Sequence, residues 1–337
     1  MAETTLLAYC RPGFERECAQ ELADASGRPG TSEQGGGFVV CPAGTHAPAW
    51  RELVFARQCL PVFATVADLP RGDRLAPILR AVGERGDSYA DAWVEAPDTD
   101  AGKALAPFCR SFGNALVGAL RQARRLDAGA PRRLHAFFPR SDNVYLAAAD
   151  VRASAPWPQG IPRLKFPRAA PSRSTLKLEE AFLVLLDDAE RSRWLAPGMS
   201  AVDLGAAPGG WTWQLVRRSL RVTAIDNGPM DRALMASGLV VHLREDGFRY
   251  RPKEPVDWLV CDMVEQPRRV AALVARWLEA GWCRRTIFNL KLPMKKRYEE
   301  TRLCLDLVRP AAELVRAKQL YHDREEITVF ASARRLR

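Results

Sequence analysis

Hydrophobic residues in the second half of the chain fall into short runs, separated by stretches in which apolar positions recur every three or four residues. A short apolar run is typical of a buried strand, and the longer recurrence is typical of a helix. Repeated strand–helix units predict an α/β domain with a mostly parallel sheet. The predicted strands are residues 199–204, 221–225, 239–243, 256–261 and 286–290, with a last strand at 326–331 closing the sheet; the predicted helices start at Trp211 and span 270–280 and about 298–307.

The first half of the chain has shorter and less regular elements, which predict an α+β domain. One apolar stretch, residues 53–65, is broken by Pro61, a residue that central strands rarely contain. The other predicted strands are residues 5–10, 37–41, 92–96, 134–138 and 143–149, and the predicted helices are 14–25, 75–82 and 108–126.

Five prolines between residues 155 and 171 predict an extended connector, because proline blocks helix continuation. We therefore expect an α+β domain at 1–154, a basic connector at 155–171 and an α/β domain at 172–337. The α/β domain opens with a helix that runs to about Leu186, for which Ser174 or Thr175 is the predicted N-cap.

The loop after the 199–204 strand contains Gly205, Gly209 and Gly210 around Pro208. In an open α/β sheet, ligands bind where such a loop leaves the carboxyl end of a strand. The spacing does not fit the G-x-G-x-x-G dinucleotide fingerprint. A proline-bearing loop after an acidic strand suggests S-adenosylmethionine, which has no phosphate to hold, although a structural turn would leave the same pattern.

Acidic residues follow three of the predicted strands. Asp226 lies 21 residues beyond Gly205, where Rossmann-like folds hold ribose hydroxyls, and Asp246 and Asp262 end the next two strands. Each is a weak signal alone, but together they suit the ribose diol, adenine amine and methionine ammonium of S-adenosylmethionine. Asp203 lies within its strand, and we expect a structural role for it.

Lys291 directly follows an apolar central strand, so its stem should be buried and its amine should reach the cleft. Desolvation and a second lysine nearby would lower its pKa, which would allow it to accept a proton at neutral pH. A neighbouring carboxylate would orient the amine but oppose that fall. A ribose 2′-hydroxyl needs such a proton acceptor to become a nucleophile. Lys177, taken alone, is typical of a solvated surface lysine.

Charge is distributed unevenly along the 337 residues. The chain has 50 Lys+Arg and 40 Asp+Glu, of which residues 1–150 carry 17 and 18, so the net charge of +10 comes from the second part. A basic catalytic part favours a polyanionic partner such as nucleic acid, although solubility charge would look the same. Seven arginines on the predicted helix 108–126 and the hairpin after it form either an RNA-facing patch or a solvated face: Arg110, Arg121, Arg124, Arg125, Arg132, Arg133 and Arg140.

The eight cysteines include no C-x-x-C pair and the four histidines are far apart, which argues against a zinc site or a disulfide scaffold. The first residues lack the order of a signal peptide, and no apolar segment approaches the ~20 residues of a membrane span. We therefore expect a cytoplasmic protein that does not enter a membrane.

The order Lys177, Asp262, Lys291, Glu326 around a P-G-G loop resembles the K-D-K-E tetrad of FtsJ-like ribose 2′-O-methyltransferases. Residues 11–15 resemble the start of proteins with a ferredoxin-like region and a THUMP RNA-binding domain. Longer blocks resemble the ribosomal RNA large subunit methyltransferase M family: 161–167, 172–182, 226–230, 243–248, 261–265, 288–298 and 321–326.

This resemblance implies a Rossmann-like S-adenosylmethionine methyltransferase domain that methylates one cytidine ribose of 23S rRNA near the peptidyl transferase centre. It implies Lys291 as the proton acceptor, with Lys177, Asp262 and Glu326 shaping the site. The choice of Glu326 over Glu325 rests on strand phase. Ala207 stands where relatives can carry cysteine, which a backbone contact would tolerate. The implied cofactor contacts are Ser174, Ala207, Pro208, Gly209, Gly210, Asp226, Asp246 and Asp262.

Two other functions compete with this one. A base methyltransferase of the cytosine-C5 type needs a nucleophilic cysteine, and Cys261 precedes Asp262 within a strand, where it should point away from the cleft. An amino-group enzyme would carry an Asn/Asp-Pro-Pro-aromatic loop where this chain has Asp262-Met263-Val264-Glu265. A non-catalytic rRNA-binding or assembly factor would not need the tetrad. The sequence does not determine the oligomeric state, and we expect a monomer.

Overall fold

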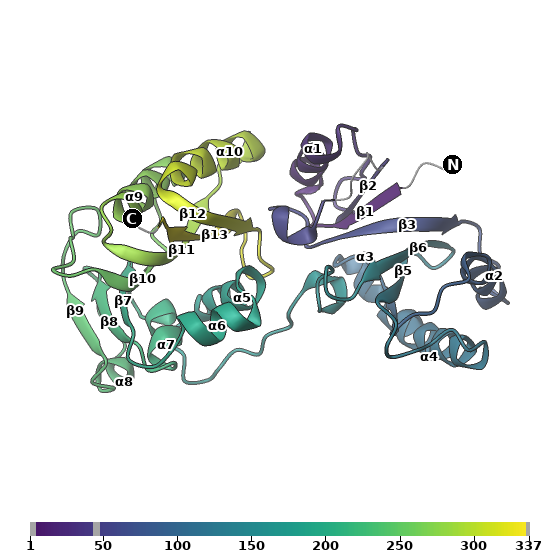
Figure 1. Cartoon of the computed structure of the whole chain (residues 1–337), viewed down its shortest axis with the longest axis horizontal. Helices are drawn as coiled ribbons and strands as arrows, with labels where there is room; N and C mark the ends of the chain where they lie inside the picture. The colour runs from purple at the N-terminus through teal and green to yellow at the C-terminus, as the bar shows by residue number, and fades with distance from the viewer. Residues whose placement is uncertain (1–4, 43–47, 335–337) are drawn as a thin grey trace. The chain divides into compact units, whose positions relative to one another are not determined.

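The computed structural model describes residues 5–42 and 48–334, which form two compact units, residues 1–162 and 163–337 (Figure 1). Among the described residues, no helix is long and apolar enough to cross a membrane. All eight cysteines are free thiols.

The first unit is a six-stranded mixed sheet with helices packed on it. Its strand order is β2-β1-β3-β6-β5-β4, antiparallel except for the parallel pair β4–β5, so β4 is an edge strand. Its elements are β1 (Thr5–Tyr9), α1 (Glu15–Ser26), β2 (Phe38–Pro42), η1 (Trp50–Glu52), β3 (Gln58–Val66), α2 (Leu75–Arg85), β4 (Ala92–Glu95), α3 (Asp100–Ala104), α4 (Ala106–Gln122), β5 (Arg132–Arg140), β6 (Asn143–Asp150) and η2 (Pro158–Gly160).

The main core of this unit lies between helices α2 and α4 and the sheet. Ile78 and Val82 of α2 and Leu116 and Leu120 of α4 pack on apolar residues of β5 and β6. Two predicted boundaries were wrong. Strand β3 continues through Pro61. The proline is paired with Leu6 of β1, and the ladder with β6 starts only at Val62, so Pro61 has a neighbouring strand on one side alone. Helix α4 ends at Gln122 rather than Leu126, and Arg124 already has a φ of 54°.

Residues 155–162, which we expected within the connector, pack on the first unit. Gln159 donates its backbone N–H to Glu95 at 2.5 Å and its side-chain amide to the carbonyl of Ala96 at 2.7 Å. Ala155 and Ile161 are buried. The division between the units therefore falls after Pro162, within the proline-rich stretch.

The second unit is a seven-stranded sheet of order β12-β13-β11-β10-β7-β8-β9, in which the last five strands are parallel and β13 and β12 are antiparallel. Its elements are α5 (Thr175–Leu185), α6 (Asp188–Trp194), β7 (Ser200–Leu204), α7 (Gly210–Val216), β8 (Arg221–Ile225), α8 (Arg232–Met235), β9 (Val240–Leu243), β10 (Val256–Cys261), α9 (Pro267–Glu279), β11 (Cys283–Lys291), α10 (Arg297–Val308), η3 (Arg309–Ala311), β12 (Ala312–Lys318) and β13 (Glu326–Ala333).

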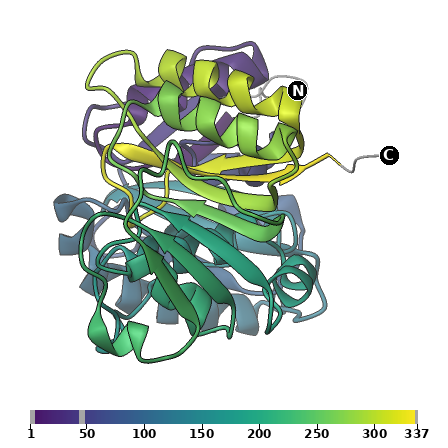
Figure 2. The same ribbon diagram turned by 90° about the vertical axis from the view of Figure 1, so that its left-hand side faces the viewer.

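Helices cover both faces of this sheet. Helices α9 and α10 lie on one face, and α5, α6 and α7 lie on the other (Figures 1 and 2). The predicted Rossmann-like α/β class with a mostly parallel sheet is confirmed. The chain runs from β7 outward through β8 and β9, then returns to place β10 and β11 on the other side of β7. The carboxyl ends of β7 and β10 therefore form the topological switch point, where α/β folds bind ligands.

The antiparallel edge of the sheet differs from the prediction. Strand β12 was not predicted, and β13 lies between β11 and β12 rather than closing the sheet. The apolar residues of β12 are interrupted by Glu313, Arg316 and Lys318, as is common in an edge strand. Ser174 takes the predicted N-cap position of α5, but it has helical backbone angles and makes no side-chain capping bond.

Candidate active site at the switch point

Four ionisable side chains from four elements meet at the carboxyl edge of the second unit's sheet. Lys291 ends β11, Glu326 begins β13, Asp262 follows β10, and Lys177 lies in the first turn of α5. The Lys291 amine lies 2.5 Å from Asp262 Oδ1 and also pairs with Glu326. Lys177 pairs with Glu326 and lies 3.6 Å from Asp262 Oδ2. The structure therefore brings together all four residues of the predicted tetrad.

Strand register explains this arrangement. In the antiparallel pair β11–β13, Lys291 is directly opposite Glu326, and Cys261 of β10 is level with Phe288 of β11. Glu325, the alternative carboxylate, instead pairs with Arg297 at 2.7 Å. Glu326 is 5% exposed, whereas the Lys291 side chain keeps 24% of its surface accessible. The amine thus sits on a buried carboxylate while remaining reachable from solvent.

The predicted fall in the Lys291 pKa is not seen in the structure. Burial lowers the pKa of Lys291, but the charges and hydrogen bonds of Asp262 and Glu326 together outweigh burial and raise it above its ordinary value. For Glu326 the effects are opposite. Burial raises its pKa, but Lys291 and Lys177 together outweigh burial and lower the pKa below its ordinary value. These opposite shifts hold Lys291 as an ammonium and Glu326 as a carboxylate.

A buried polar network that the sequence reading missed lies beneath the tetrad. Asn289, two residues before Lys291, donates its amide to Asp262 Oδ1 at 3.0 Å, and the same nitrogen lies 3.5 Å from Glu326 Oε2. The Thr328 hydroxyl donates to Asn289 Oδ1 at 2.7 Å and lies 3.0 Å from Asp323 Oδ2. Burial and the nearby Glu326 raise the pKa of Asp323 well above its ordinary value. A protonated Asp323 can donate to Thr328, which leaves the hydroxyl proton for Asn289.

A second missed residue, Glu180, ties the helix of Lys177 to the turn before Glu326. Its carboxylate accepts the backbone N–H groups of Tyr321 and His322 at 2.8 and 2.9 Å, and it lies 2.6 Å from His322 Nδ1. Glu180 is 2% exposed on a mostly apolar helix. A carboxylate at a core-facing helical position was the one signal that could have indicated it.

The glycine-rich loop packs closely on the start of α5. A Cβ atom at Gly210 would clash with the hydroxyl oxygens of Ser174 and Ser172, which lie 2.6 Å from each other. Gly209 has a φ of +116°, a backbone conformation that side chains disfavour. Ser174 therefore lies against the loop, as a shared cofactor site requires, and the adjoining Pro208 is exposed.

The predicted ribose-binding carboxylate, Asp226, lies at the loop. Its Oδ2 accepts the backbone N–H of Ala207 at 3.0 Å, and its Oδ1 accepts that of Gly228 at 2.7 Å. Asp203 is instead buried beneath the loop, where its Oδ2 accepts the Thr212 hydroxyl at 2.6 Å. Burial raises the pKa of Asp203 to about 7, which suits the structural role expected for it.

The loops after β7, β9 and β10 converge on Met263. A Cβ at Gly205 would lie 2.7 Å from the Met263 side chain, and one at Gly247 would lie 3.1 Å from its sulfur. Asp246, next to Gly247, is exposed and accepts the backbone N–H of Phe248 at 2.8 Å. The loops that carry Asp246 and Asp262 therefore meet at Met263, against the start of the glycine-rich loop.

Three protein-family models match ranges of this chain. The FtsJ-like methyltransferase family model matches residues 170–324, which contain the loop and three residues of the tetrad. The model of the ribosomal RNA large subunit methyltransferase M N-terminal region matches residues 73–150, and the RlmM ferredoxin-like domain matches residues 3–60. The predicted ferredoxin-like region is thus confirmed.

Relatives of known name extend the match to nearly the whole chain. Ribosomal RNA large subunit methyltransferase M of Xanthomonas axonopodis pv. citri (strain 306) is 56% identical over 342 residues, covering 97% of this chain and 98% of that protein. The chain belongs to the ribosomal RNA large subunit methyltransferase M family. A second member, from Xanthomonas oryzae pv. oryzae (strain PXO99A), is also 56% identical with the same coverage. The family assignment covers both units of the chain.

Proposed function

We propose that this protein transfers the methyl group of S-adenosylmethionine to the ribose 2′-hydroxyl of a cytidine in 23S rRNA near the peptidyl transferase centre. The observation that carries the proposal is the Lys291 amine, held between Asp262 and Glu326 at the switch point. Methyl transfer to rRNA follows from the family name of its relatives. We favour a ribose hydroxyl over a base as the methyl acceptor, because a hydroxyl is a weak nucleophile that needs a proton acceptor such as Lys291, oriented by carboxylates.

The polar groups at this edge of the sheet suit S-adenosylmethionine by their chemistry. Asp226 offers carboxylate oxygens to a ribose diol, and the loop from Ala207 through Pro208 and Gly209 to Gly210 offers close backbone approach. Asp246 would hold the adenine amine and Asp262 the methionine ammonium, with Ser174 beside the loop. When bound, the cofactor supplies an electrophilic methyl group on a positively charged sulfur.

The tetrad orients the nucleophile and moves its proton. Lys291 must lose its proton before it can accept one from the ribose hydroxyl, and its raised pKa opposes this in the free protein. A cationic ligand and expulsion of water from the crevice both favour the neutral amine. Lys177 keeps Glu326 paired while Lys291 changes its protonation. Asp262 would then hold the neutral amine toward the hydroxyl, which would position that oxygen for attack on a bound methyl donor.

The rival with a nucleophilic cysteine has little support. Cys261 is fully buried, and burial raises the pKa of its thiol to about 12, so the thiolate is scarce at neutral pH. A non-catalytic rRNA-binding factor would have no use for two lysines paired to two carboxylates in a crevice. An rRNA substrate and eight free thiols favour a cytoplasmic protein, which we propose acts as a monomer.

The deciding experiment is Lys291→Arg, assayed by tritium transfer onto rRNA that lacks the modification. Arginine keeps a cation between Asp262 and Glu326 but cannot act as a base. We expect methyl transfer to fall by about 10²–10⁴-fold, the usual contribution of a general base, and to find cofactor affinity within about two-fold by calorimetry. Lys291→Ala should likewise abolish transfer and leave cofactor affinity nearly intact.

The matched control is Lys253→Arg, an exposed lysine that precedes β10 and so lies at the opposite end of that strand from Asp262, which should retain full activity. Nucleoside mass spectrometry of the product should find the label on a 2′-O-methylcytidine. Full activity of Lys291→Arg, or label on a base, would contradict the proposal.

A further inference from the structure

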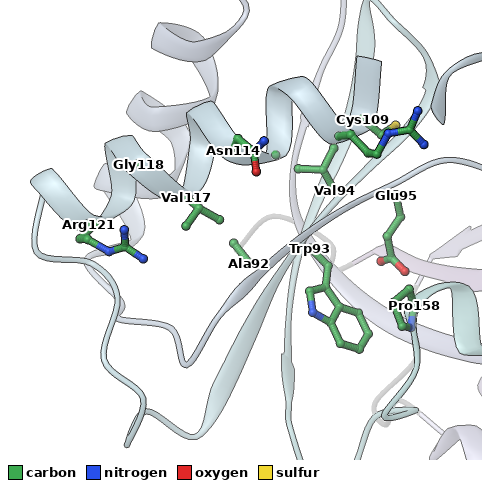
Figure 3. Close-up of a pocket in the computed structure, with 12 residues that line it drawn as sticks. Ala92, Trp93, Val94, Glu95, Cys109, Asn114, Val117, Gly118, Arg121 and Pro158 are labelled. Atoms are coloured by element: carbon green, nitrogen blue, oxygen red, sulfur yellow. The ribbon is translucent and has the colours of Figure 1, made fainter. Parts of the chain in front are cut away.

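A groove runs along the open edge of the first unit's sheet, in a different unit from the tetrad. Strand β4 pairs with β5 on one side only, and helix α4 packs on the face of the sheet to which Val94 of β4 points. The groove has a volume of about 540 Å³ and follows both elements (Figure 3). Gly113 and Gly118 of α4 line it, so the helix leaves room at the strand edge. The edge strand presents backbone groups that no neighbouring strand of the described chain takes up.

The helix side of the groove carries positive charge that is available to a ligand. Arg110, Asn114 and Arg121 line it, are exposed, and share one face of α4 because they follow helical spacing. Within the described part of the chain, Arg110 and Arg121 have no ion pair, whereas Arg132, Arg133 and Arg140 of the same arginine-rich region pair with aspartates. Eleven residues of helix separate the backbones of Arg110 and Arg121 by about 16 Å, so the two side chains suit two different phosphates.

The strand side of the groove carries an aromatic platform. Trp93 projects from β4 on the side away from α4 and is partly exposed (Figure 3). The Arg133 guanidinium stacks 3.5 Å from the centre of the indole ring and is held there by Asp91 at 2.6 Å. The stacked guanidinium of Arg133 fixes the orientation of the Trp93 ring and places a positive charge beside it.

Glu95, the acidic residue in the groove lining, is turned inward. Its Oε2 accepts the Tyr9 hydroxyl at 3.0 Å and lies 2.8 Å from His135 Nδ1, while its Oε1 accepts the Gln159 N–H. With 4% exposure it presents little charge to a ligand. The exposed charge of the groove is therefore positive.

We propose that this groove binds a single-stranded segment of the RNA substrate, with phosphates at Arg110 and Arg121 and one base stacked on Trp93. A positively charged track beside an aromatic ring is the arrangement that single strands need, since every base has a face to stack. A duplex is disfavoured, because its bases are already stacked on one another and cannot reach a recessed indole. The proposal rests on an RNA substrate as proposed above, and it selects two of the seven arginines for phosphate contact.

The test is the affinity of Arg110→Ala/Arg121→Ala for a fluorescently labelled, unstructured 12-nucleotide RNA, measured by anisotropy without cofactor. We expect binding to weaken about ten-fold at 150 mM salt, and the slope of log affinity against log salt to fall by about 1.4, the value for two phosphate contacts to a single strand. Trp93→Ala should weaken binding by at least about five-fold and Trp93→Phe by much less, because phenylalanine still stacks.

The matched control, Arg16→Ala/Arg80→Ala, removes the same charge from exposed positions of helices α1 and α2 in the same unit. If the groove double variant binds RNA within two-fold of this control, the proposal is wrong, and an extended protein segment becomes the better occupant of the strand edge. Photocrosslinking of 4-thiouridine RNA should label the peptides of β4 and α4, and labelling confined to other peptides would also overturn it. Because neither readout involves methyl transfer, Lys291→Arg protein should bind the RNA normally even if the proposed chemistry fails.

Discussion

Lys291 and Glu326 face each other across the antiparallel ladder of β11 and β13, as the last residue of one strand and the first of the other. This pairing holds a cation and a carboxylate together at the edge of the sheet where the two strands end. It also works against the proposed chemistry, because Glu326 stabilises the protonated form of the base. The rate should therefore depend on pH in a way that reports on this pair.

Glu326→Gln should move the rising limb of the pH–rate profile to lower pH. Burial lowers the pKa of Lys291 and the two carboxylates raise it, so removal of one negative charge lets the amine deprotonate more easily. The maximal rate should fall as well, because the amine loses a partner that orients it. The measurement is kcat/KM for methyl transfer from pH 6 to 10.

The control for that variant is Glu325→Gln, the adjacent carboxylate, which pairs with Arg297 instead. It should leave the position of the rising limb unchanged. A rising limb that stays in place, or moves to higher pH, in Glu326→Gln would mean that Lys291 is not the titrating base.

Thr328→Val should reduce kcat about ten- to hundred-fold with little change in KM, because the hydroxyl fixes the amide of Asn289 and hence the position of Asp262. Thr286→Val is the matched control, since Thr286 lies on neighbouring β11, is fully buried, and its hydroxyl has no partner in the described structure. That control should keep its activity. Equal losses in the two variants would indicate general damage to the sheet.

A second variant, Asn289→Asp, tests the same hydrogen-bond network by placing a negative charge in it. A third carboxylate beside Asp262 and Glu326 should raise the pKa of Lys291 further. The rising limb of the pH–rate profile should then move to higher pH, opposite to Glu326→Gln. A purely structural role for Asn289 would leave that limb in place.

Glu180→Ala should destabilise the second unit by about 2–4 kcal/mol, because it leaves the part-buried backbone donors of Tyr321 and His322 without an acceptor. Glu179→Ala, one residue earlier, removes a partly exposed ion pair with Arg218 and should cost about 1 kcal/mol or less. Denaturant unfolding followed by a probe in the second unit measures both. Similar losses in the two variants would contradict the anchoring role of Glu180.

The sequence pattern was sufficient for features that depend on local order. Apolar runs predicted the parallel strands, and because such strands end at one edge, Asp262 and Lys291 could be expected to meet. Features that depend on distant pairing were not accessible. The antiparallel register that places Glu326 on Lys291 also brings Thr328 opposite Asn289, and no local pattern marks either pair.

The pKa of Lys291 illustrates the same limit. The direction of its pKa shift depends on whether two carboxylates lie near enough to outweigh burial, and this depends on distance rather than on residue type. The arginine-rich region is a further case. Seven arginines look equivalent in the sequence, but the fold brings Asp87 to Arg132 and Asp91 to Arg133, and the neighbouring Asp142 pairs with Arg140. Only the structure distinguishes the arginines that remain available.

Asp203 makes a last prediction, concerning stability rather than catalysis. Burial raises its pKa to about 7 in the folded protein, so between the unfolded value near 4 and pH 7 the folded state holds a proton that the unfolded state has lost. Its contribution to stability is therefore fully present below about pH 4 and is lost as pH rises through 7. The loss amounts to roughly 4 kcal/mol, from about three units at 1.36 kcal/mol each.

Asp203→Asn cannot ionise and should remove this dependence. Its carbonyl oxygen can still accept the Thr212 hydroxyl, while its amide replaces Oδ1, which has no hydrogen-bond partner in the described structure. The variant is expected to be less stable than the parent at pH 5, where the parent is protonated, and to lose less stability between pH 5 and 8. Calorimetric melting of the second unit at pH 5, 6, 7 and 8 measures this difference. Parallel curves for the two proteins would show that Asp203 ionises in the folded state as easily as in the unfolded chain.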